Sequence, residues 1–333
     1  MKKLKKPKKM IIFTLLTLLL MGFVYEQSRE FIDNKKLKAP GKLLEINGHR
    51  IHIYGIGKSK NSPTVVFTSG WRTPSPYVDY YSLQKETAKY TRSIIYERPG
   101  YGWSEIAKGE RNIDTITTEL HKLLNKNGEK GPYILVGHSF GSNEVLRFAQ
   151  LFPKEVAGVV LLDGSNPDYT TTLKRPSKYF LKYGGLKYTL LNNTFNFLNN
   201  FGITRLLFDT SNIYSSKLTN YKNNLKLVDD SLKEIDESMI IKTLNNKNHL
   251  QEIRMDAKKL VENNNIGNIP LKVITSSLYN NSKLTRDIQL GLLNWSTNSE
   301  HIIADNSQHY IHWFRQDIVM KEIIKLINYK GEK

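Results

Sequence analysis

The segment Gly137–Gly141, with Ser139 at its centre, constrains the fold more than any other part of this 333-residue chain. The preceding run, Tyr133–Val136, is typical of a short buried strand, and apolar residues follow at helical spacing from 142 to 151. A serine with glycine two residues before and after it, between a strand and a helix, is typical of a nucleophile elbow. Such a turn strains the serine backbone and admits only small neighbours, which lifts the hydroxyl clear of the sheet near the helix N-terminus.

The order of apolar patterns along the chain predicts the fold class. Strand-like runs alternate with helical patterns from Thr64 to Asp163, and the alternation resumes from Pro270 to Leu326. This order predicts an α/β fold with a mostly parallel sheet and crossover helices. Before it, Asn47-Gly48 between two strand-like segments predicts a β-hairpin. Between the two alternating parts lie about a hundred residues of helical runs, rich in apolar and aromatic side chains, that match no known motif.

Four further segments, taken with the elbow, resemble the α/β-hydrolase family. Residues 64–71 resemble the family's third strand and the oxyanion loop after it, and residues 96–104 resemble its strand-four loop. Residues 159–163 resemble strand six, and residues 305–312 resemble the loop that carries the catalytic histidine. The resemblance covers about two-thirds of the chain.

This resemblance implies a division of the chain into a core and a cap. It implies an α/β-hydrolase sheet flanked by helices, built in two parts from residues 42–164 and 268–333. The segment between them, residues 165–267, resembles the family's helical cap, inserted between strands six and seven. We call this segment the insertion.

The resemblance also implies the nucleophile and the base. A serine hydroxyl needs a general base, and the base needs an orienting carboxylate. In the family the chain order is serine, acid, histidine. This order assigns Ser139 as nucleophile and His309 as base, because His309 lies in the matching loop. His312 is the alternative base, and its other expected role is to line the site or pack the last helix. The remaining histidines match no catalytic position: His49, His52, His121, His138, His249 and His301.

The acid is where this chain departs from the commonest family pattern, in which a carboxylate follows strand seven. Residues 275–282 end that strand without Asp or Glu, whereas Asp163 ends strand six, 24 residues after Ser139. One helix and one strand fill this interval, so Asp163 is expected at the sheet edge that carries the nucleophile. We predict Asp163 as the acid, with a helix cap or loop anchor as its alternative role. Asp168 and Asp287 are the weaker candidates.

Two backbone N–H groups are expected to form the oxyanion hole. Phe140 follows the nucleophile, and Trp71 follows the glycine at the end of strand three, so their N–H groups are the predicted donors. Arg98 is expected to link loops structurally rather than to bind substrate. Ser142 replaces a glycine common in the family, and residues 314–317 lack a proline often found after the histidine. Neither departure removes a group that the chemistry requires.

The N-terminus indicates a membrane anchor. Residues 1–9 hold six lysines, and residues 10–26 begin with an uncharged apolar run of 16 residues. No small-residue cleavage site follows, which favours an uncleaved anchor over a secretory signal peptide or a peripheral basic helix. The lysines are expected to stay in the cytoplasm as a basic tail, which places the catalytic domain outside. Residues 27–41, charged and polar, are interpreted as a linker out of the membrane.

Composition excludes several classes of protein. The absence of cysteine excludes a thiol nucleophile, a disulfide framework and a Cys-ligated metal. The formal net charge of +18 favours a solvated basic surface over an anionic partner, and no nucleic-acid-binding motif is present. Serine hydrolysis of this kind needs no cofactor or metal ion, and none is predicted.

The leading hypothesis from sequence is a membrane-anchored serine carboxylesterase that cleaves an apolar acyl ester. The alternative enzyme is an aminopeptidase or amidase with the same triad, which needs carboxylates in the cap to hold a substrate amine. A non-catalytic interaction protein on a hydrolase scaffold is the third hypothesis, and the complete triad argues against it. The oligomeric state is left open. The candidate amine-binding carboxylates lie on what is expected to be a solvated helix face: Asp229, Asp230, Glu234, Asp236 and Glu237.

Overall fold

The computed structural model describes residues 5–59, 61–168, 185–210, 230–244, 248, 252 and 258–329. Eight strands form one sheet in the order β1-β2-β4-β3-β5-β6-β7-β8. The strands are β1 (Lys42–Ile46), β2 (His49–Ile56), β3 (Thr64–Thr68), β4 (Ser93–Glu97), β5 (Tyr133–His138), β6 (Val156–Leu162), β7 (Leu271–Ser276) and β8 (Ser299–Ala304).

The sheet is mostly parallel, as the sequence predicts. Only the β1–β2 and β2–β4 pairs are antiparallel, and every pair from β4–β3 to β7–β8 is parallel. Asn47 and Gly48 join β1 to β2 with φ values of 51° and 81°. Two positive φ values suit the tight turn that matches the twist of a hairpin, which confirms the predicted β-hairpin.

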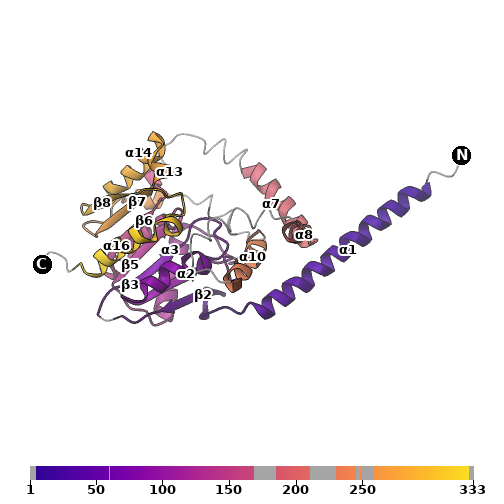
Figure 1. The fold of residues 1–333 in the computed structure, drawn as a ribbon, viewed down its shortest axis with the longest axis horizontal. Helices are drawn as coiled ribbons and strands as arrows, with labels where there is room; N and C mark the ends of the chain where they lie inside the picture. Colours follow the sequence, from indigo (N-terminus) through magenta and orange to yellow (C-terminus); the bar gives the residue numbers. More distant parts are fainter. Residues whose placement is uncertain are drawn as a thin grey trace.

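Helices cover both faces of the sheet (Figure 1). On one face, α3 (Ile113–Lys126) and α4 (Gly141–Leu151) pack leucine and valine side chains on the strands. On the other, α2 (Pro76–Thr87) and α16 (Gln316–Ile327) bury a second apolar cluster. This confirms the predicted α/β-hydrolase architecture. Shorter helices border the last strands: α13 (Ser277–Asn280), α14 (Lys283–Gly291), α15 (Ile311–Phe314) and the 3₁₀ segments Pro153–Glu155 and Leu292–Trp295.

The insertion lies in the chain between β6 and β7, and most of its described residues are helical. Its helices are α7 (Gly185–Asn200), α8 (Ile203–Thr210), α10 (Asp230–Leu244) and the short α12 (Lys258–Val261). The aromatic run at 179–181, His249 and Asp229 lie outside the described residues. That this segment acts as a cap stays a prediction.

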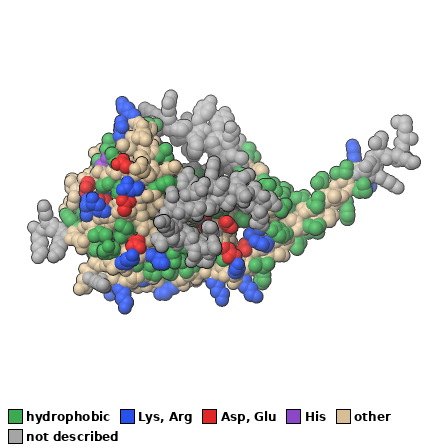
Figure 2. All heavy atoms as spheres, in the orientation of Figure 1, with side chains coloured by type: hydrophobic (Ala, Val, Ile, Leu, Met, Phe, Trp, Pro, Cys, Tyr) green, Lys and Arg blue, Asp and Glu red, His purple; other side chains and the backbone are tan. Residues whose placement is uncertain are grey.

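The N-terminal helix α1 (Lys5–Lys36) projects from the rest of the molecule (Figures 1 and 2). Over Lys8–Lys36 it contains an 18-residue window with a mean hydropathy of 1.8, of which 6% is buried. Its length and composition suffice to cross a membrane, although signal sequences share both properties. The helix continues through the first ten residues of the predicted linker, which the sequence did not indicate.

Candidate active site

The turn after β5 has the geometry of an elbow. Ser139 lies between β5 and α4 with φ at +50°, a left-handed conformation that is costly for a residue with a side chain. A Cβ atom on Gly137 would lie 2.8 Å from the Gly141 carbonyl oxygen, and one on Gly141 would lie 2.6 Å from the Thr68 carbonyl oxygen. Only glycine fits at either position, so both glycines of the motif are required by close backbone contacts.

Asp163 and His309 are brought together at the carboxyl edge of the sheet. The Asp163 Oδ2 atom lies 3.3 Å from the His309 Nδ1 atom. The Asp163 side chain is fully buried, whereas that of His309 is 30% exposed. The same carboxylate accepts hydrogen bonds from the Ser276 N–H at 2.8 Å and from the Ser276 hydroxyl at 2.6 Å. These bonds compensate the charge for its loss of water and fix its orientation.

Ser276 is a site residue that sequence analysis missed. It ends β7, the strand after which the family commonly carries its acid, and here it donates two hydrogen bonds to the acid candidate on β6. Its hydroxyl also accepts a bond from the Tyr279 N–H and so caps α13. The signal in the sequence was the absence of Asp and Glu from the end of β7, because a carboxylate supplied by the neighbouring strand needs a donor there.

His138 couples the elbow to the histidine loop. Its Nε2 atom lies 2.9 Å from the His309 carbonyl oxygen, to which it donates, and the two imidazole ring centres are 4.6 Å apart. Burial, reinforced by the nearby His309 and His312 rings, holds the pKa of His138 well below its usual value. A neutral His138 retains the Nε2 proton for this bond without adding a charge beside Ser139.

His312 has the environment of a core residue. It is 1% exposed, stacks on Tyr80 with ring centres 4.7 Å apart, and neither ring nitrogen has a hydrogen-bond partner. Burial, with the nearby His309 as a second cause, lowers the pKa of His312 to about 3. Of the two histidines in this loop, His309 therefore contacts the buried carboxylate, and His312 packs beneath the site.

The loop after β3 lies against the elbow. A Cβ atom on Gly70 would come within 3.4 Å of the Ser139 Cβ, so Trp71, the next residue, follows immediately beside the nucleophile candidate. Arg98 is 1% exposed and donates to the Ser69 and Gly70 carbonyl oxygens, both at 2.8 Å. Arg98 therefore holds this loop by its backbone, the structural role that the sequence indicated. Phe140 directly precedes α4, where backbone N–H groups lack partners within the helix.

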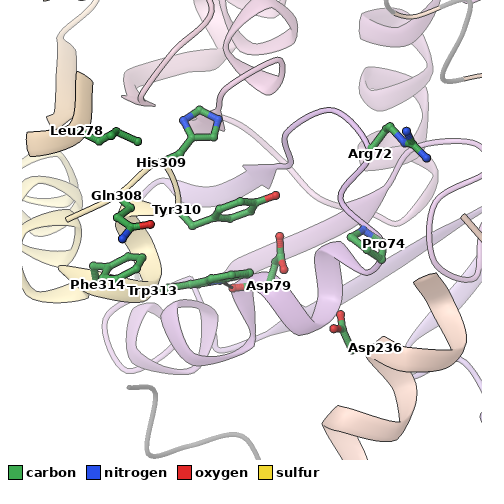
Figure 3. Close-up of a pocket in the computed structure, with 10 residues that line it drawn as sticks. All are labelled: Arg72, Pro74, Asp79, Asp236, Leu278, Gln308, His309, Tyr310, Trp313 and Phe314. Atoms are coloured by element: carbon green, nitrogen blue, oxygen red, sulfur yellow. Dashed lines mark hydrogen bonds between the residues drawn. The ribbon is translucent and has the colours of Figure 1, made fainter. Parts of the chain in front are cut away.

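A pocket of about 400 Å³ opens beside His309 (Figure 3). Neither Ser139 nor His138 is among its lining residues, but His138 bonds the backbone carbonyl oxygen of His309, which lines the pocket. Figure 3 shows Asp79 of α2 and Asp236 of α10 with their carboxylates in this pocket, below Tyr310. The two are 5% and 3% exposed. The residues that line the pocket are Arg72, Pro74, Asp79, Asp236, Leu278, Gln308, His309, Tyr310, Trp313 and Phe314.

Asp236 corrects one interpretation and Asp79 was missed. The sequence placed Asp236 on a solvated helix face, but tertiary packing turns it into the pocket, whereas Glu234 and Glu237 on the same helix are exposed. Asp79 is an isolated acid between aromatic and apolar residues of α2, a pattern that indicates burial and gives no hint of the pocket.

The other two acid candidates, Asp168 and Asp287, have different environments from that of Asp163. The Asp168 carboxylate accepts a bond from the Trp295 indole at 3.1 Å, and Asp287 is exposed on α14. Among the described residues, no three His, Asp or Glu side chains are grouped so that they can hold a metal ion. The candidate site therefore combines the Asp163–His309 contact with the Ser139 elbow and the loop after β3.

Comparison with known proteins identifies the family. A model of the α/β-hydrolase fold family matches residues 63–316. Because this match spans most of the chain, the protein belongs to that family. It is also 31% identical over 189 residues to an uncharacterized protein, YbdG, of Bacillus subtilis (strain 168), a match that covers 56% of this chain. The match spans only 58% of YbdG.

Solved structures share the fold at low sequence identity. The epoxide hydrolase CorEH matches 86% of this chain and 97% of its own with a TM-score of 0.61 and 18% identity. A thermophilic esterase from Thermogutta terrifontis matches 86% of this chain and 97% of its own with a TM-score of 0.59 and 16% identity. Since these neighbours catalyse different hydrolytic reactions, the likeness establishes the fold and leaves the reaction to be argued from the site.

Proposed function

We propose that the protein is a membrane-anchored serine hydrolase that cleaves a carboxylic ester of an apolar acyl group through Ser139, His309 and Asp163. The observation that carries the proposal is the contact of the His309 imidazole with the buried Asp163 carboxylate, beside a serine held at a positive φ. A serine in a strained turn and a buried, hydrogen-bonded carboxylate both cost stability. Hydrolysis by a serine nucleophile is the function that requires both.

The chemistry proceeds in two halves. The Ser139 hydroxyl attacks the ester carbonyl carbon while the His309 Nε2 atom takes its proton, and the N–H groups of Phe140 and Trp71 stabilise the developing oxyanion. The imidazolium then gives the proton to the leaving alcohol, which leaves an acyl-enzyme. A water molecule, deprotonated by His309, attacks the acyl carbon; the bond to the Ser139 oxygen then breaks, the imidazolium returns its proton to that oxygen, and the carboxylic acid leaves. Asp163 holds the imidazole tautomer and stabilises its charged form throughout.

A second candidate is an aminopeptidase or amidase that uses the same three residues. The observation that favours it is the pair Asp79 and Asp236, whose carboxylates line the pocket beside His309. The ammonium group of a bound substrate would lie next to them. A panel of p-nitrophenyl esters, run beside aminoacyl anilides, distinguishes the two. If anilides turn over faster and Asp236→Asn raises their KM alone, the amidase assignment replaces the esterase.

The proposed location follows from α1. The apolar helix and the preceding lysines favour a single-pass protein, with its catalytic domain outside the cytoplasm. Expression of the full chain tests this: we expect the intact mass in the membrane fraction and protease access to the catalytic domain from outside. A trimmed soluble form as the main species contradicts the anchor and supports a signal peptide.

The test of the nucleophile uses a fluorophosphonate probe on the full-length protein. We expect Ser139→Ala to abolish both covalent labelling and ester turnover, because no other hydroxyl is predicted to be activated. Ser142→Ala is a matched control, since it removes a buried serine hydroxyl that bonds the Gly137 carbonyl oxygen, and it should keep the label. Labelling of Ser139→Ala with unchanged stoichiometry overturns the proposal.

A further inference from the structure

The insertion helices α7 and α8 have an inverted distribution of side chains. On α8, Thr204 and Arg205 are buried, 6% and 5% exposed, whereas the next two residues, both leucines, are each 57% exposed. On α7, Asn199 is buried at 2% exposure while large apolar side chains lie outside. We call these side chains the insertion face: Leu190, Phe197, Leu206 and Leu207, each between 50% and 58% exposed. A helix on a protein in water buries its apolar stripe, so this pattern indicates that the insertion face does not meet water.

The buried charge of α8 is held by the N-terminal helix. The Arg205 guanidinium donates to both Glu26 carboxylate oxygens at 3.0 Å and to an Asp33 oxygen at 2.9 Å. Glu26 is 4% exposed, the one buried residue among the described side chains of α1. A two-pronged, charge-assisted contact of this kind fixes the relative orientation of two helices as well as joining them.

The backbones of the two elements also approach closely next to this ion pair. A Cβ atom on Gly22 would lie 2.3 Å from the Phe201 carbonyl oxygen, so only glycine allows the α7–α8 turn to reach α1. The Phe23 and Phe201 rings lie 6.3 Å apart on the same side. Small residues that let helix backbones meet are characteristic of helix contacts within membranes.

The insertion face is continuous with the apolar part of α1. Gly22 and Phe23 belong to the apolar run of α1, and they contact the turn that joins α7 to α8. Figure 1 shows α8 beside the middle of α1, with the sheet and α14 farther away, and Figure 2 shows apolar side chains along α1 and over the adjoining edge of the molecule. Whatever surrounds Gly22 and Phe23 therefore also meets the start of α8.

We propose that the insertion face lies in the membrane interface, with its leucine and phenylalanine side chains buried at the boundary between lipid headgroups and acyl chains. The proposal rests on the proposed membrane anchor. It adds that α7 and α8 form a second contact with the membrane, and that Arg205 joins α8 to α1. Helices that lie in the interface bury their apolar side about 5–10 Å deep. The insertion is thereby held on the bilayer surface.

The chain contains no cysteine, which makes the test direct. The single substitutions Leu190→Cys, Leu206→Cys and Leu16→Cys each accept a fluorescent label in the full-length protein, reconstituted in vesicles of phosphatidylethanolamine and phosphatidylglycerol. Nitroxide lipids then quench labels that touch the bilayer. Leu284→Cys on α14 is the matched control, because Leu284 is an apolar residue that is also 57% exposed. We expect strong quenching at residues 190 and 206 by nitroxides near the headgroups, and a several-fold weaker effect at residue 284.

Leu16 separates the two proposals. If the label at residue 16 is quenched by deep nitroxides while those at residues 190 and 206 behave like the one at residue 284, the anchor stands and the interfacial face is wrong. If the labels at residues 190 and 206 are quenched but the one at residue 16 is not, the face binds lipid and the spanning anchor is wrong. If neither is quenched, both are wrong. Labels that are shielded from aqueous iodide but not quenched by lipid indicate a second copy on this face, which also overturns the proposal.

Discussion

The central sheet and the α1–α7–α8 region bury opposite kinds of side chain. Strands β3 and β5 are buried along their whole length and fill the interior with valine, isoleucine and leucine. Where α1 meets α8, the buried groups are the Glu26 carboxylate and the Arg205 guanidinium, and the leucines lie outside. The sheet has the pattern of a protein in water, with apolar side chains inside. The second region has apolar side chains outside and charges inside, which is the pattern expected for contact with lipid.

The two regions also use buried charge differently. At the sheet edge, the Asp163 carboxylate is satisfied by Ser276 and still presents an oxygen to His309, which reaches the pocket. On α1, both Glu26 carboxylate oxygens accept hydrogen bonds from Arg205. A buried carboxylate that also contacts a solvent-accessible imidazole is suited to catalysis. A buried carboxylate whose two oxygens both bind one guanidinium is suited to holding two helices together. Substitutions in the two regions should therefore affect activity and attachment separately.

The largest expected effect is that of His309→Ala. Removal of the base should lower ester turnover by about 10⁶-fold, comparable with loss of the nucleophile, because the two groups act as a unit. His312→Ala, three residues on, removes a buried ring and should reduce stability while turnover per folded molecule changes little. Steady-state kinetics on both variants, corrected for folded fraction, provide the measurement. If His312→Ala is the more damaging to turnover, the base has been misplaced by three residues.

The second prediction concerns the acid. Asp163→Asn preserves size but removes the charge that orients and stabilises the imidazolium, so turnover should fall by about 10⁴-fold. Asp287→Asn changes an exposed carboxylate on α14 in the same way and should leave turnover unchanged. If Asp163→Asn keeps more than about a tenth of wild-type turnover, the acid is another residue. Unchanged membrane attachment in both variants would sharpen the contrast between the regions.

The sequence predicted the core because its signals are local. The glycines around Ser139, the Asn47-Gly48 turn and the alternation of apolar runs each depend on neighbours in the chain, and each prediction agrees with the fold. The pairing of Glu26 with Arg205 joins residues 179 positions apart, and no local pattern specifies it. The same holds for Asp236, whose side of α10 is decided by packing, and for Ser276, whose role depends on a carboxylate from another strand.

The third prediction tests attachment through Arg205→Ala. Removal of Arg205 leaves the Glu26 carboxylate buried without its partner, and breaking a buried ion pair typically costs about 3–5 kcal/mol. We expect a lower melting temperature for the insertion and weaker lipid quenching at residue 190, with fluorophosphonate labelling of Ser139 retained. Arg50→Ala is the control, because Arg50 also forms a close pair with a glutamate, Glu105, but is exposed. Equal losses for the two variants would show that burial of the Arg205 pair is not what holds the insertion.

The smallest effect concerns the pH dependence of stability, and His312 carries it. Its pKa is lowered to about 3 in the folded protein, against about 6.5 for an unfolded chain. Between these values the unfolded state binds one more proton, so the free energy of unfolding falls as the pH is lowered from about 6.5 toward 3. At pH 5 the loss attributable to His312 is about 2 kcal/mol relative to pH 8.

His312→Phe should remove this pH-dependent loss, since phenylalanine does not titrate. Comparison of each protein with itself at the two pH values cancels any constant packing cost. Because the His312 ring also lowers the pKa of His138, the difference between the two pH responses reports His312 together with its effect on His138. Urea unfolding at pH 8 and pH 5 gives the measurement. An identical pH response in wild type and variant would mean that His312 is solvated or charged in the folded state, and that it is not a packed core histidine distinct from the reactive His309.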